Sequence, residues 1–408
     1  MAQMKKILFY FTHNQTLGHS KRIINIINWL KKNTNSIEIS VFAGGKPQPC
    51  LKTALPSRVT WITLPFSDSS KFKFQGINSN ENIRNANFDK RINYATKKLH
   101  QIKPDIFITD FFPFGRPEYK KEIFLLIKSL KSKGTKIFAS IGYPYFTINP
   151  KKILPICKLY DKFLIHTPPN LDTNYFYRNI EKEKHTTKQD YIKLFNNEIK
   201  NKLVYTGYIS SYSDPKKNIN TFTNKFSSKG KILVVVSRGG GTYYPKIIAY
   251  SIIAKKYLDN NYIFLVIPGP ATSKSEMNLF QKCIDKLKTK NIHLIKYIDT
   301  LSSILKTADI SISTAGYNTT VDLLSLKKKA ILIPFMGYNP NSVYIEQLCH
   351  AQILQDYIGS KILSYSKFNP KIIADNIKSM AKAKFHPKVE IDKSWFEGGE
   401  KTAKILLA

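Results

Sequence analysis

One stretch, Ile310 to Phe335, constrains the fold of this chain more than any other. It reads ISISTAGYNTTVDLLSLKKKAILIPF, with a short apolar segment at each end. Between them a glycine turn, Ala315 to Asn318, precedes about nine residues with helical spacing. The pattern predicts a strand, a glycine turn, a helix and a second strand, which is the repeating unit of an α/β fold with a parallel sheet.

The turn and its helix have the chemistry of a phosphate site. A glycine lets the backbone approach a ligand closely, and the first N–H groups of a helix carry partial positive charge. Asp322 follows about one turn into the helix, where its carboxylate is suited to accept hydrogen bonds from ribose hydroxyls. The alternative is an ordinary strand–helix–strand unit whose glycine only shapes a turn.

These residues resemble the nucleotide-sugar site of GT-B glycosyltransferases, in particular the C-terminal half of the family 28 enzymes that includes the lipid II-forming N-acetylglucosaminyltransferase. The resemblance implies that Gly316, Asn318 and Thr319 bind the donor diphosphate. It implies that Asp322 binds the ribose, at a position where the family usually has Glu. The implied fold is α/β of GT-B type, two doubly wound, Rossmann-like domains facing across a cleft.

A second glycine turn stands earlier in the same half of the chain. Lys231 to Val236 is a run of apolar, mostly β-branched residues, typical of a buried parallel strand, and it leads into SRGGGT. No GK[ST] follows, so the turn is not a P-loop. The resemblance places Gly239 and Gly240 against the donor diphosphate and lets Arg238 neutralise the leaving group; the alternative is a flexible turn with a solvated arginine.

The same resemblance assigns the rest of the donor. It places Tyr297 or Ile298 against the base, with uracil expected, and Glu346 and Gln347 near the sugar hydroxyls. By the same resemblance we expect no metal, no cofactor other than the nucleotide-sugar co-substrate, and inversion at the anomeric carbon.

The first half opens with a strand and a histidine-bearing turn. Lys6 to Phe11 predicts a buried strand, and an amphipathic helix follows from about Lys21 to Lys31. His19 lies between them, in a Gly-His turn similar to one that GT-B enzymes and related sugar-nucleotide hydrolases carry there. A histidine at this edge of a parallel sheet is a candidate general base, with His13 as the second candidate. A purely structural histidine is the alternative.

A further strand, Asp105 to Thr109, ends in DFFPFGR. These seven residues resemble the DxFPFGR signature of a set of bacterial predicted glycosyltransferases. Asp110 is expected at the same sheet edge as His19, where a carboxylate orients a histidine and raises its basicity. The alternative is that Asp110 caps the next turn and that Arg116 forms a surface ion pair.

The chain predicts two domains. Residues 1–212 form an N-terminal, acceptor-side domain and residues 213–229 a polar linker, followed by a nucleotide-sugar-binding domain, residues 230–390, and a tail helix, residues 391–408, that returns to the first domain. Further strands are expected at Glu38–Phe42, Thr60–Leu64, Thr135–Ile141, Tyr160–His166, Leu203–Ile209, Tyr262–Ile267 and Ile292–Tyr297.

Composition narrows the class of protein. Hydrophobic residues make up 42% of the chain, and no stretch reaches the roughly 18 apolar residues of a membrane span. The four cysteines are scattered without a CxxC pair, which indicates neither zinc nor a disulfide framework. We therefore expect a cytoplasmic protein, with peripheral contact at the inner face of the membrane as an alternative.

The net charge of +36 has two interpretations. One is a polyanionic partner, either an anionic membrane surface or nucleic acid. The other is compositional drift, because only seven of the 64 basic residues are arginine and the remaining 57 are lysine. Nucleic-acid readers favour arginine for bidentate contacts, so drift is the preferred explanation.

Together these patterns predict a glycosyltransferase that moves a hexose or amino-sugar from a nucleotide sugar, with UDP expected, to an acceptor hydroxyl. The alternatives are a sugar-nucleotide hydrolase or epimerase of the same fold, and a protein that binds or glycosylates nucleic acid.

Overall fold

A computed structural model describes most of the chain. The described residues are 4–11, 17–44, 55–65, 81–116, 119–142, 150–171, 175–176, 193–210, 230–240, 244–299, 301–335, 345–383 and 389–408. They divide into two compact units. The first comprises Met1–Asn14, His19–Ile209 and Glu397–Ala408, and the second comprises Gln15–Gly18 and Ser210–Phe396.

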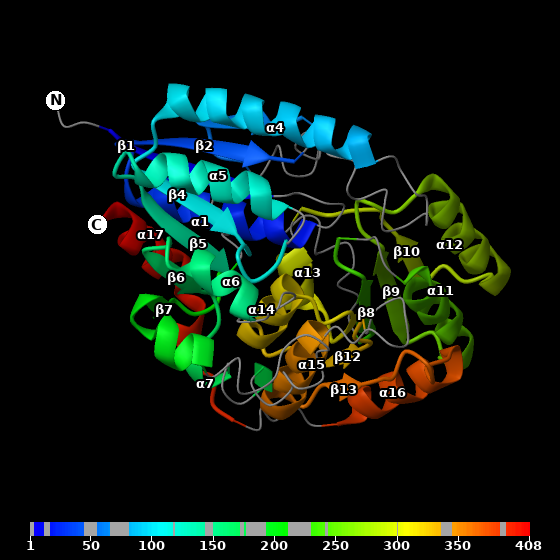
Figure 1. Cartoon of the computed structure of the whole chain (residues 1–408). Helices are drawn as coiled ribbons and strands as arrows, with labels where there is room; N and C mark the ends of the chain where they lie inside the picture. The colour runs from blue at the N-terminus through cyan, green and yellow to red at the C-terminus, as the bar shows by residue number, and fades with distance from the viewer. Residues whose placement is uncertain are drawn as a thin grey trace. The chain divides into compact units, whose positions relative to one another are not determined.

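The first unit is built on a seven-stranded parallel sheet (Figure 1). The strand order is β3-β2-β1-β4-β5-β6-β7, so the chain moves outward from β1 in one direction and then restarts beside β1 in the other. This reversal is the doubly wound order. The strands are β1 (Lys5–Phe11), β2 (Ile37–Ala43), β3 (Val59–Thr63), β4 (Ile106–Asp110), β5 (Lys136–Ile141), β6 (Lys162–Ile165) and β7 (Leu203–Tyr205).

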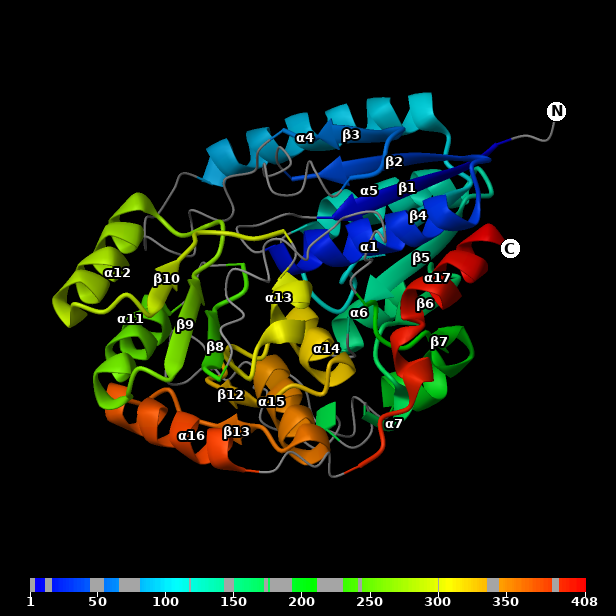
Figure 2. The same ribbon diagram turned by 180° about the vertical axis from the view of Figure 1, so that it is seen from behind.

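Helices cover both faces of this sheet, which is why its central strands are apolar on both sides. Helices α1 and α17 lie on the face toward the viewer in Figure 2, and α4 and α5 lie on the face toward the viewer in Figure 1. One face of β1 packs with α1 through a shared core of isoleucines and phenylalanines. The helices of the unit are α1 (Leu17–Asn33), α4 (Glu81–Ile102), α5 (Lys120–Lys131), α6 (Pro150–Cys157), α7 (Pro169–Leu171), a π-helix (Lys193–Glu198), a 3₁₀ turn (Lys200–Lys202) and α17 (Gly398–Leu407).

A buried ion pair joins α4 to α5. The Nε of Arg91 lies 2.6 Å from a carboxylate oxygen of Glu122, and neither side chain is exposed. Arg91 also donates to the Tyr10 hydroxyl on β1 and to the carbonyl of Pro65. One guanidinium therefore fixes two helices, a strand and the segment after β3.

The second unit repeats the same winding on a six-stranded parallel sheet. Its order is β10-β9-β8-β11-β12-β13, with the reversal between β8 and β11. The strands are β8 (Ile232–Ser237), β9 (Tyr262–Ile267), β10 (Ile292–Leu294), β11 (Ile310–Ser313), β12 (Ala330–Leu332) and β13 (Lys361–Ile362).

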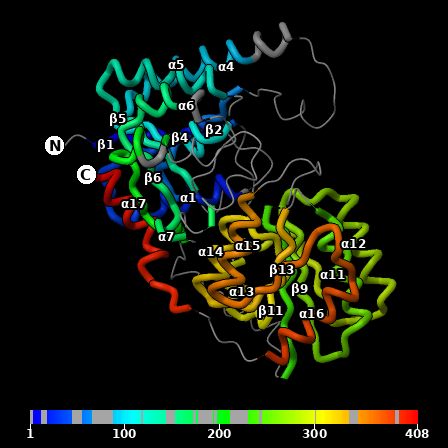
Figure 3. Tube along the Cα trace, turned by 60° about the horizontal axis from the view of Figure 1, so that its bottom comes forward, coloured from blue at the N-terminus to red at the C-terminus, as the bar shows by residue number. Residues whose placement is uncertain are grey.

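The main core of the second unit lies between its sheet and three helices, α11, α12 and α16, which lie near β9 in Figure 3. Ile247 of α11, Phe280 of α12 and Ile377 of α16 pack in this core, and none of them is exposed. The helices are α11 (Pro245–Ala254), a 3₁₀ turn (Lys255–Tyr257), α12 (Lys274–Leu287), α13 (Leu301–Thr307), α14 (Tyr317–Ser325), α15 (Ile345–Ile358), α16 (Pro370–Lys382) and a 3₁₀ turn (Lys393–Phe396).

The predicted α/β class with parallel sheets is confirmed, and the expected strands are present. Four predicted strands, Tyr160–His166, Leu203–Ile209, Ile292–Tyr297 and Ala330–Phe335, are each at least three residues shorter than expected. Helix α4 begins at Glu81, in a polar stretch whose first two turns show no apolar period that would predict a helix. The two-residue strand β13 was not predicted, since such a segment has no readable alternation.

The last helix, α17, packs in the first unit through two glycines. The N–H of Gly398 donates to the carbonyl of Tyr208, and Lys5 Nζ donates to the carbonyl of Leu407. A Cβ on Gly398 would lie 2.1 Å from the carbonyl oxygen of Gly207, and one on Gly399 would lie 2.2 Å from the Trp29 ring. Close backbone approach, and not helix propensity, therefore determines glycine at this helix start.

We expect Gly398→Ala to lower the free energy of unfolding by about 1 to 3 kcal/mol, because the new methyl overlaps backbone that cannot move away. In an ordinary helix the same change stabilises by up to about 1 kcal/mol. Urea denaturation measures the difference. Lys401→Ala, on the exposed side of the same helix, is the control and should stay within about 0.5 kcal/mol of the unchanged protein; a stabilised Gly398→Ala protein would contradict the packing.

Candidate active site

The polar residues of interest gather where the strand order of each sheet reverses. In the first unit β1 and β4 are neighbours, with Tyr10 beside Thr109, and their carboxyl ends lead to His19 and to Asp110. In the second unit β8 and β11 are neighbours, with Ser237 beside Ser313. Crevices at these reversals are the usual ligand sites of open α/β sheets.

His19 and Asp110 are in direct contact. Nδ1 of His19 lies 2.6 Å from Oδ2 of Asp110, and the histidine side chain is 22% exposed while the carboxylate is fully buried. The ring of His19 also lies edge-on to the Phe111 ring. The structure therefore brings together the two residues that the sequence could only assign to one edge of a sheet.

Asp110 is held as an anion by more than the histidine. Arg22, on α1 and only 2% exposed, donates from a terminal guanidinium nitrogen to the other carboxylate oxygen at 2.5 Å. Burial raises the pKa of Asp110, but His19, Arg22 and Arg116 together outweigh burial and hold it far below its usual range. Arg22 was not among the predicted site residues, although the Gly-His-Ser-x-Arg spacing places it on the same face of α1 as His19.

His19 is neutral at pH 7. Burial lowers its pKa below the ordinary 6.5 and outweighs the opposing effect of Asp110, and Arg116 and Arg22 lower it further. Since Asp110 is ionised, the Nδ1–H of the histidine donates to it, which leaves a lone pair on Nε2. This is the arrangement of a general base oriented by a carboxylate.

The DFFPFGR segment forms a tight, aromatic turn around Asp110. Phe111 has a left-handed backbone conformation, with φ of 62°, and the N–H of Gly115 donates to its carbonyl. Phe112 and Phe114 are not exposed, and Thr109 Oγ1 donates to the carbonyl of Phe112. The apolar residues of the motif thus fill the core, and its two charged ends, Asp110 and Arg116, remain at the site.

A second histidine lies buried at the same edge of the sheet. Nε2 of His166 is 2.9 Å from the Ser140 hydroxyl and Nδ1 is 2.8 Å from the Thr206 hydroxyl. Burial holds the pKa of His166 well below its usual value. His166 follows β6 directly, so its position at a strand end could have marked it as a candidate site residue. Its contacts with two hydroxyls depend on the folded chain. It ties together the ends of β5, β6 and β7.

In the second unit, α14 starts directly after β11. Gly316 is its N-cap and has no side chain with which to cap the helix, and a helix start of this kind is suited to bind an anion. Thr320 is tied to the carbonyl of Gly316 through both its N–H and its hydroxyl. Asn318 is half-buried, and Thr319 and Asp322 are 9% and 8% exposed.

The glycine turn after β8 also lies at the reversal. Gly239 has φ of 67°, a backbone conformation that favours glycine, and Gly240 is half-buried. The Arg238 side chain beside them is fully buried, and its three nitrogens donate to Pro268, Thr272 and Glu276 at 3.0 Å each. This geometry makes Arg238 a brace between the turn and the start of α12 rather than an open anion ligand.

The remaining predicted donor residues are partly exposed. Tyr297 and Ile298 lie just beyond β10 and are half-buried. Glu346 and Gln347 lie in the first turn of α15, where the Gln347 side-chain oxygen accepts from the N–H of Phe335 at 2.8 Å. Their roles toward a donor stay predictions.

Sequence analysis missed His350, which supports the turn before α14. The residue is fully buried on α15, and its Nδ1–H donates to the carbonyl of Ala315 at 3.0 Å. Burial lowers the pKa of His350 to about 4, so the ring is neutral at pH 7. No motif marks it, because the contact joins residues 35 positions apart.

Two predicted features lie outside the described residues. These are His13 and the linker at 213–229. Among the described residues no helix is long and apolar enough to cross a bilayer. The described side chains also contain no group of three or more His, Cys, Asp or Glu arranged to hold a metal ion.

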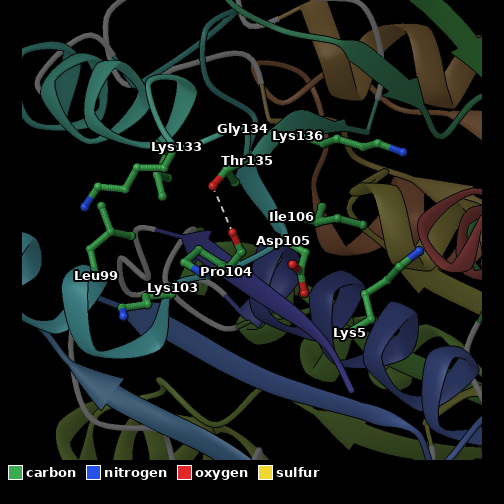
Figure 4. Close-up of a pocket in the computed structure, with 11 residues that line it drawn as sticks. Lys5, Leu99, Lys103, Pro104, Asp105, Ile106, Lys133, Gly134, Thr135 and Lys136 are labelled. Carbon is green, nitrogen blue, oxygen red and sulfur yellow. Dashed lines mark hydrogen bonds between the residues drawn. The ribbon is translucent and has the colours of Figure 1, made fainter. Parts of the chain in front are cut away.

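A cavity of about 490 Å³ lies at the opposite edge of the first sheet, where β1, β4 and β5 begin (Figure 4). Lys103 and Lys133 stand on one side of it, and Lys5 and Lys136 on the other. The cavity lies at the C-terminal ends of α4 and α5, where lysines complement the helix dipoles. Ligands of open α/β sheets bind at the carboxyl ends of the strands, so we place the chemistry at that edge, with His19.

Asp110→Asn should lower the free energy of unfolding by about 3 to 5 kcal/mol at pH 7, because it leaves Arg22 buried without its counter-charge. The folded pKa of Asp110 is depressed, so its contribution is present above the ordinary value near 3.9 and is lost as the pH falls below it. Urea denaturation at several pH values should show the gap to the unchanged protein beginning to narrow as the pH falls below about 4. The control is Asp89→Asn, an exposed partner of Lys121, which should cost at most about 1 kcal/mol; equal losses in both variants would refute the assignment.

His350→Gln should change how stability depends on pH. The folded pKa of about 4 lies below the ordinary 6.5, so the unfolded chain takes up a proton that the folded chain refuses between these values. This residue alone should cost the unchanged protein about 3 kcal/mol of stability between pH 6.5 and 4. Denaturation titrations should show a flatter slope for His350→Gln and an unchanged slope for the exposed His100→Gln; parallel slopes in all three proteins would contradict the prediction.

A family model and a curated relative each match part of the chain. Residues 247–404 match the sequence model of the glycosyltransferase family 28 C-terminal domain. A curated relative, the UDP-N-acetylglucosamine--N-acetylmuramyl-(pentapeptide) pyrophosphoryl-undecaprenol N-acetylglucosamine transferase of Prochlorococcus marinus (strain MIT 9515), is 28% identical over 99 residues, or 24% of this chain. That match spans 26% of the relative, about a quarter of its length.

Solved structures match nearly the whole chain. MurG of Acinetobacter baumannii aligns with a TM-score of 0.54 at 14% identity, covering 92% of this chain and 90% of its own. The UDP-GlcNAc 2-epimerase of Methanocaldococcus jannaschii, in complex with UDP-GlcNAc and UDP, aligns at 0.58 with 13% identity, covering 98% and 99%. These identities establish the fold alone. The chain therefore has the GT-B fold, and its residues 247–404 match the model of the glycosyltransferase family 28 C-terminal domain.

Proposed function

We propose that this protein is a glycosyltransferase that moves a hexose or amino-sugar from a nucleotide sugar to an acceptor hydroxyl. The observation that carries the proposal is the neutral His19, held by the buried Asp110 at the reversal point of the first sheet. It supplies a general base in a chain whose other half contains the family 28 domain. Neither feature alone would distinguish transfer from simple nucleotide binding.

In the proposed reaction His19 acts on the acceptor. Its Nε2 takes the proton of the acceptor hydroxyl as the oxygen attacks the anomeric carbon of the donor sugar. The bond from that carbon to the diphosphate breaks, and the nucleoside diphosphate leaves with the electron pair. Asp110 stabilises the imidazolium that forms, and Arg22 keeps Asp110 ionised. An in-line displacement of this kind inverts the anomeric configuration.

The donor diphosphate is assigned to the second unit. The uncapped start of α14, with Gly316, Asn318 and Thr319, offers backbone N–H groups and the positive end of a helix dipole to an anion. Gly239 and Gly240 provide a second backbone surface at the neighbouring strand end. These dipoles support the proposal that no metal is needed to hold the leaving group.

The rest of the donor is assigned to residues near this helix. Asp322 receives the ribose hydroxyls, and Tyr297 or Ile298 the base. Glu346 and Gln347 receive the sugar hydroxyls. UDP is the proposed nucleotide, supported by the names of the Prochlorococcus relative and the Methanocaldococcus structure. The diphosphate contact predicted for Arg238 is replaced here by a bracing role, because its donors are already used within the protein.

Location and partners belong to the same proposal. A cytoplasmic protein with a peripheral contact to an anionic membrane surface fits both the acceptor of the named relative and the charge of +36. Nucleic acid remains the rival partner, and steeply salt-dependent DNA binding would support it. Hydrolase and epimerase activities on the same fold would appear as nucleotide release without acceptor, or as an altered sugar with the nucleotide still attached.

Thermal unfolding with UDP, GDP, dTDP and CMP tests the donor site. A nucleotide at 100 times its dissociation constant should stabilise the protein by about 2.7 kcal/mol, and we expect UDP to give the largest shift. Asp322→Ala should abolish most of that shift because it removes the ribose acceptor. The matched control is Asp375→Ala, which removes a half-exposed carboxylate paired with Lys371 on α16 and should leave the shift intact.

His19→Ala completes the test. It should retain the nucleotide shift and lose sugar transfer, because the base acts only on the acceptor. No shift with any nucleotide, combined with a shift on adding short DNA, would overturn the transferase proposal.

A further inference from the structure

Arg116 lies at the candidate active site, and no role has yet been given to it. The N–H of Gly115 donates to the carbonyl of Phe111 at 3.0 Å, so the turn after Asp110 folds back on itself and brings its end beside the site. The Phe111 ring in that turn is 5.8 Å from the ring of His19, centroid to centroid. Arg116 follows with φ of 63°, a left-handed conformation that costs a non-glycine residue energy.

Arg116 makes no ion-pair contact within the part of the chain that the structure describes, although its charge also acts on Asp110. Its Nε is buried and has no hydrogen-bond acceptor, and none of the ion pairs between described residues includes it. The surface ion pair considered for Arg116 is therefore not present among the described residues. A buried donor without an acceptor is uncommon in a native protein and needs an explanation.

The charges around His19 do not balance. Asp110 supplies one negative charge, and Arg22 and His19 already occupy both of its oxygens. Arg22 is buried and neutralised, whereas Arg116 is partly exposed. With His19 neutral, the described residues of the site, Asp110, Arg22 and Arg116, carry one more positive than negative charge, and Arg116 is the partly exposed one.

We propose that Arg116 binds an oxyanion, a phosphate or a carboxylate, on the acceptor molecule. This rests on the proposed function, since it assigns the acceptor to the first unit. A guanidinium presents a planar fork of donors that matches both groups in bidentate fashion, and Arg116 is the partly exposed guanidinium beside the base. It would select acceptors that carry such a group near the hydroxyl to be glycosylated.

Binding of the oxyanion would also activate the base. The positive charge of Arg116 lowers the pKa of His19, and a bound anion would cancel that effect. The pKa of His19 would then rise from its lowered value, so that the histidine becomes more basic only when an acceptor is in place. Recognition and proton abstraction would be coupled through one charge.

The experiment follows the imidazole nitrogens of His19 by NMR in the full chain labelled with ¹⁵N-histidine. Resonances are assigned by their loss in His19→Gln. Methyl phosphate and sodium acetate are titrated separately at constant ionic strength, and the pKa of His19 is measured with and without each. The variant is Arg116→Gln, and the control is Arg58→Gln, an exposed arginine that also has a left-handed backbone conformation. Circular dichroism and thermal unfolding establish that both variants are folded.

We expect at least one of the two anions to raise the pKa of His19 in the unchanged protein and in Arg58→Gln. Its apparent dissociation constant should weaken by at least about tenfold in Arg116→Gln, the loss of a charge-assisted hydrogen bond. The anion that binds identifies the acceptor group as phosphate or carboxylate. If neither anion moves the His19 resonances, or if Arg116→Gln responds as strongly as the unchanged protein, the proposal is overturned.

The result is independent of the donor site. Nucleotide binding is read by the thermal shift that depends on Asp322, and oxyanion binding is read at His19. A protein that binds nucleotide but no oxyanion keeps the transferase proposal and loses this one. A protein that binds the oxyanion through Arg116 but no nucleotide keeps the oxyanion site and loses the transferase proposal.

Discussion

The site depends on one topological constraint, the reversal of strand order within each parallel sheet. In both units the chain winds outward from a first strand and then restarts beside it, so β1 adjoins β4 and β8 adjoins β11. In open α/β sheets the connections after such strands run to opposite faces, and ligands bind at the carboxyl edge between them. His19, Asp110 and the two glycine turns lie at the carboxyl ends of these four strands.

Within the first unit a single buried carboxylate organises the charges. Asp110 stays ionised because Arg22 and His19 occupy its two oxygens, and its ionisation in turn fixes the tautomer of the histidine. Burial and the nearby arginines keep His19 neutral at pH 7. Arg116 is in none of the ion pairs between described residues, so its positive charge is available to an anionic ligand next to the oriented base.

Local patterns predicted much of the architecture. Strands such as Tyr262–Ile267 are unbroken apolar runs between turn residues, and their bounds agree with the structure. Where the local pattern is weak the prediction failed: the polar start of α4 has no apolar period, and β13 has only two residues. The sequence alone does not show that the Arg238 side chain is engaged within the protein, because its partners Thr272 and Glu276 lie more than thirty positions away in the chain.

The fold class, the parallel sheets, and the histidine, the aspartate and the two glycine turns at strand ends could be inferred from local sequence patterns, because these features depend on residues near one another in the chain. The contact of Asp110 with His19, the ion pair with Arg22 and the support that His350 gives to the turn before α14 are visible only in the folded chain. These contacts join residues brought together by strand order and helix packing. Neither the apolar period nor the turn chemistry of a single segment encodes which strands become neighbours.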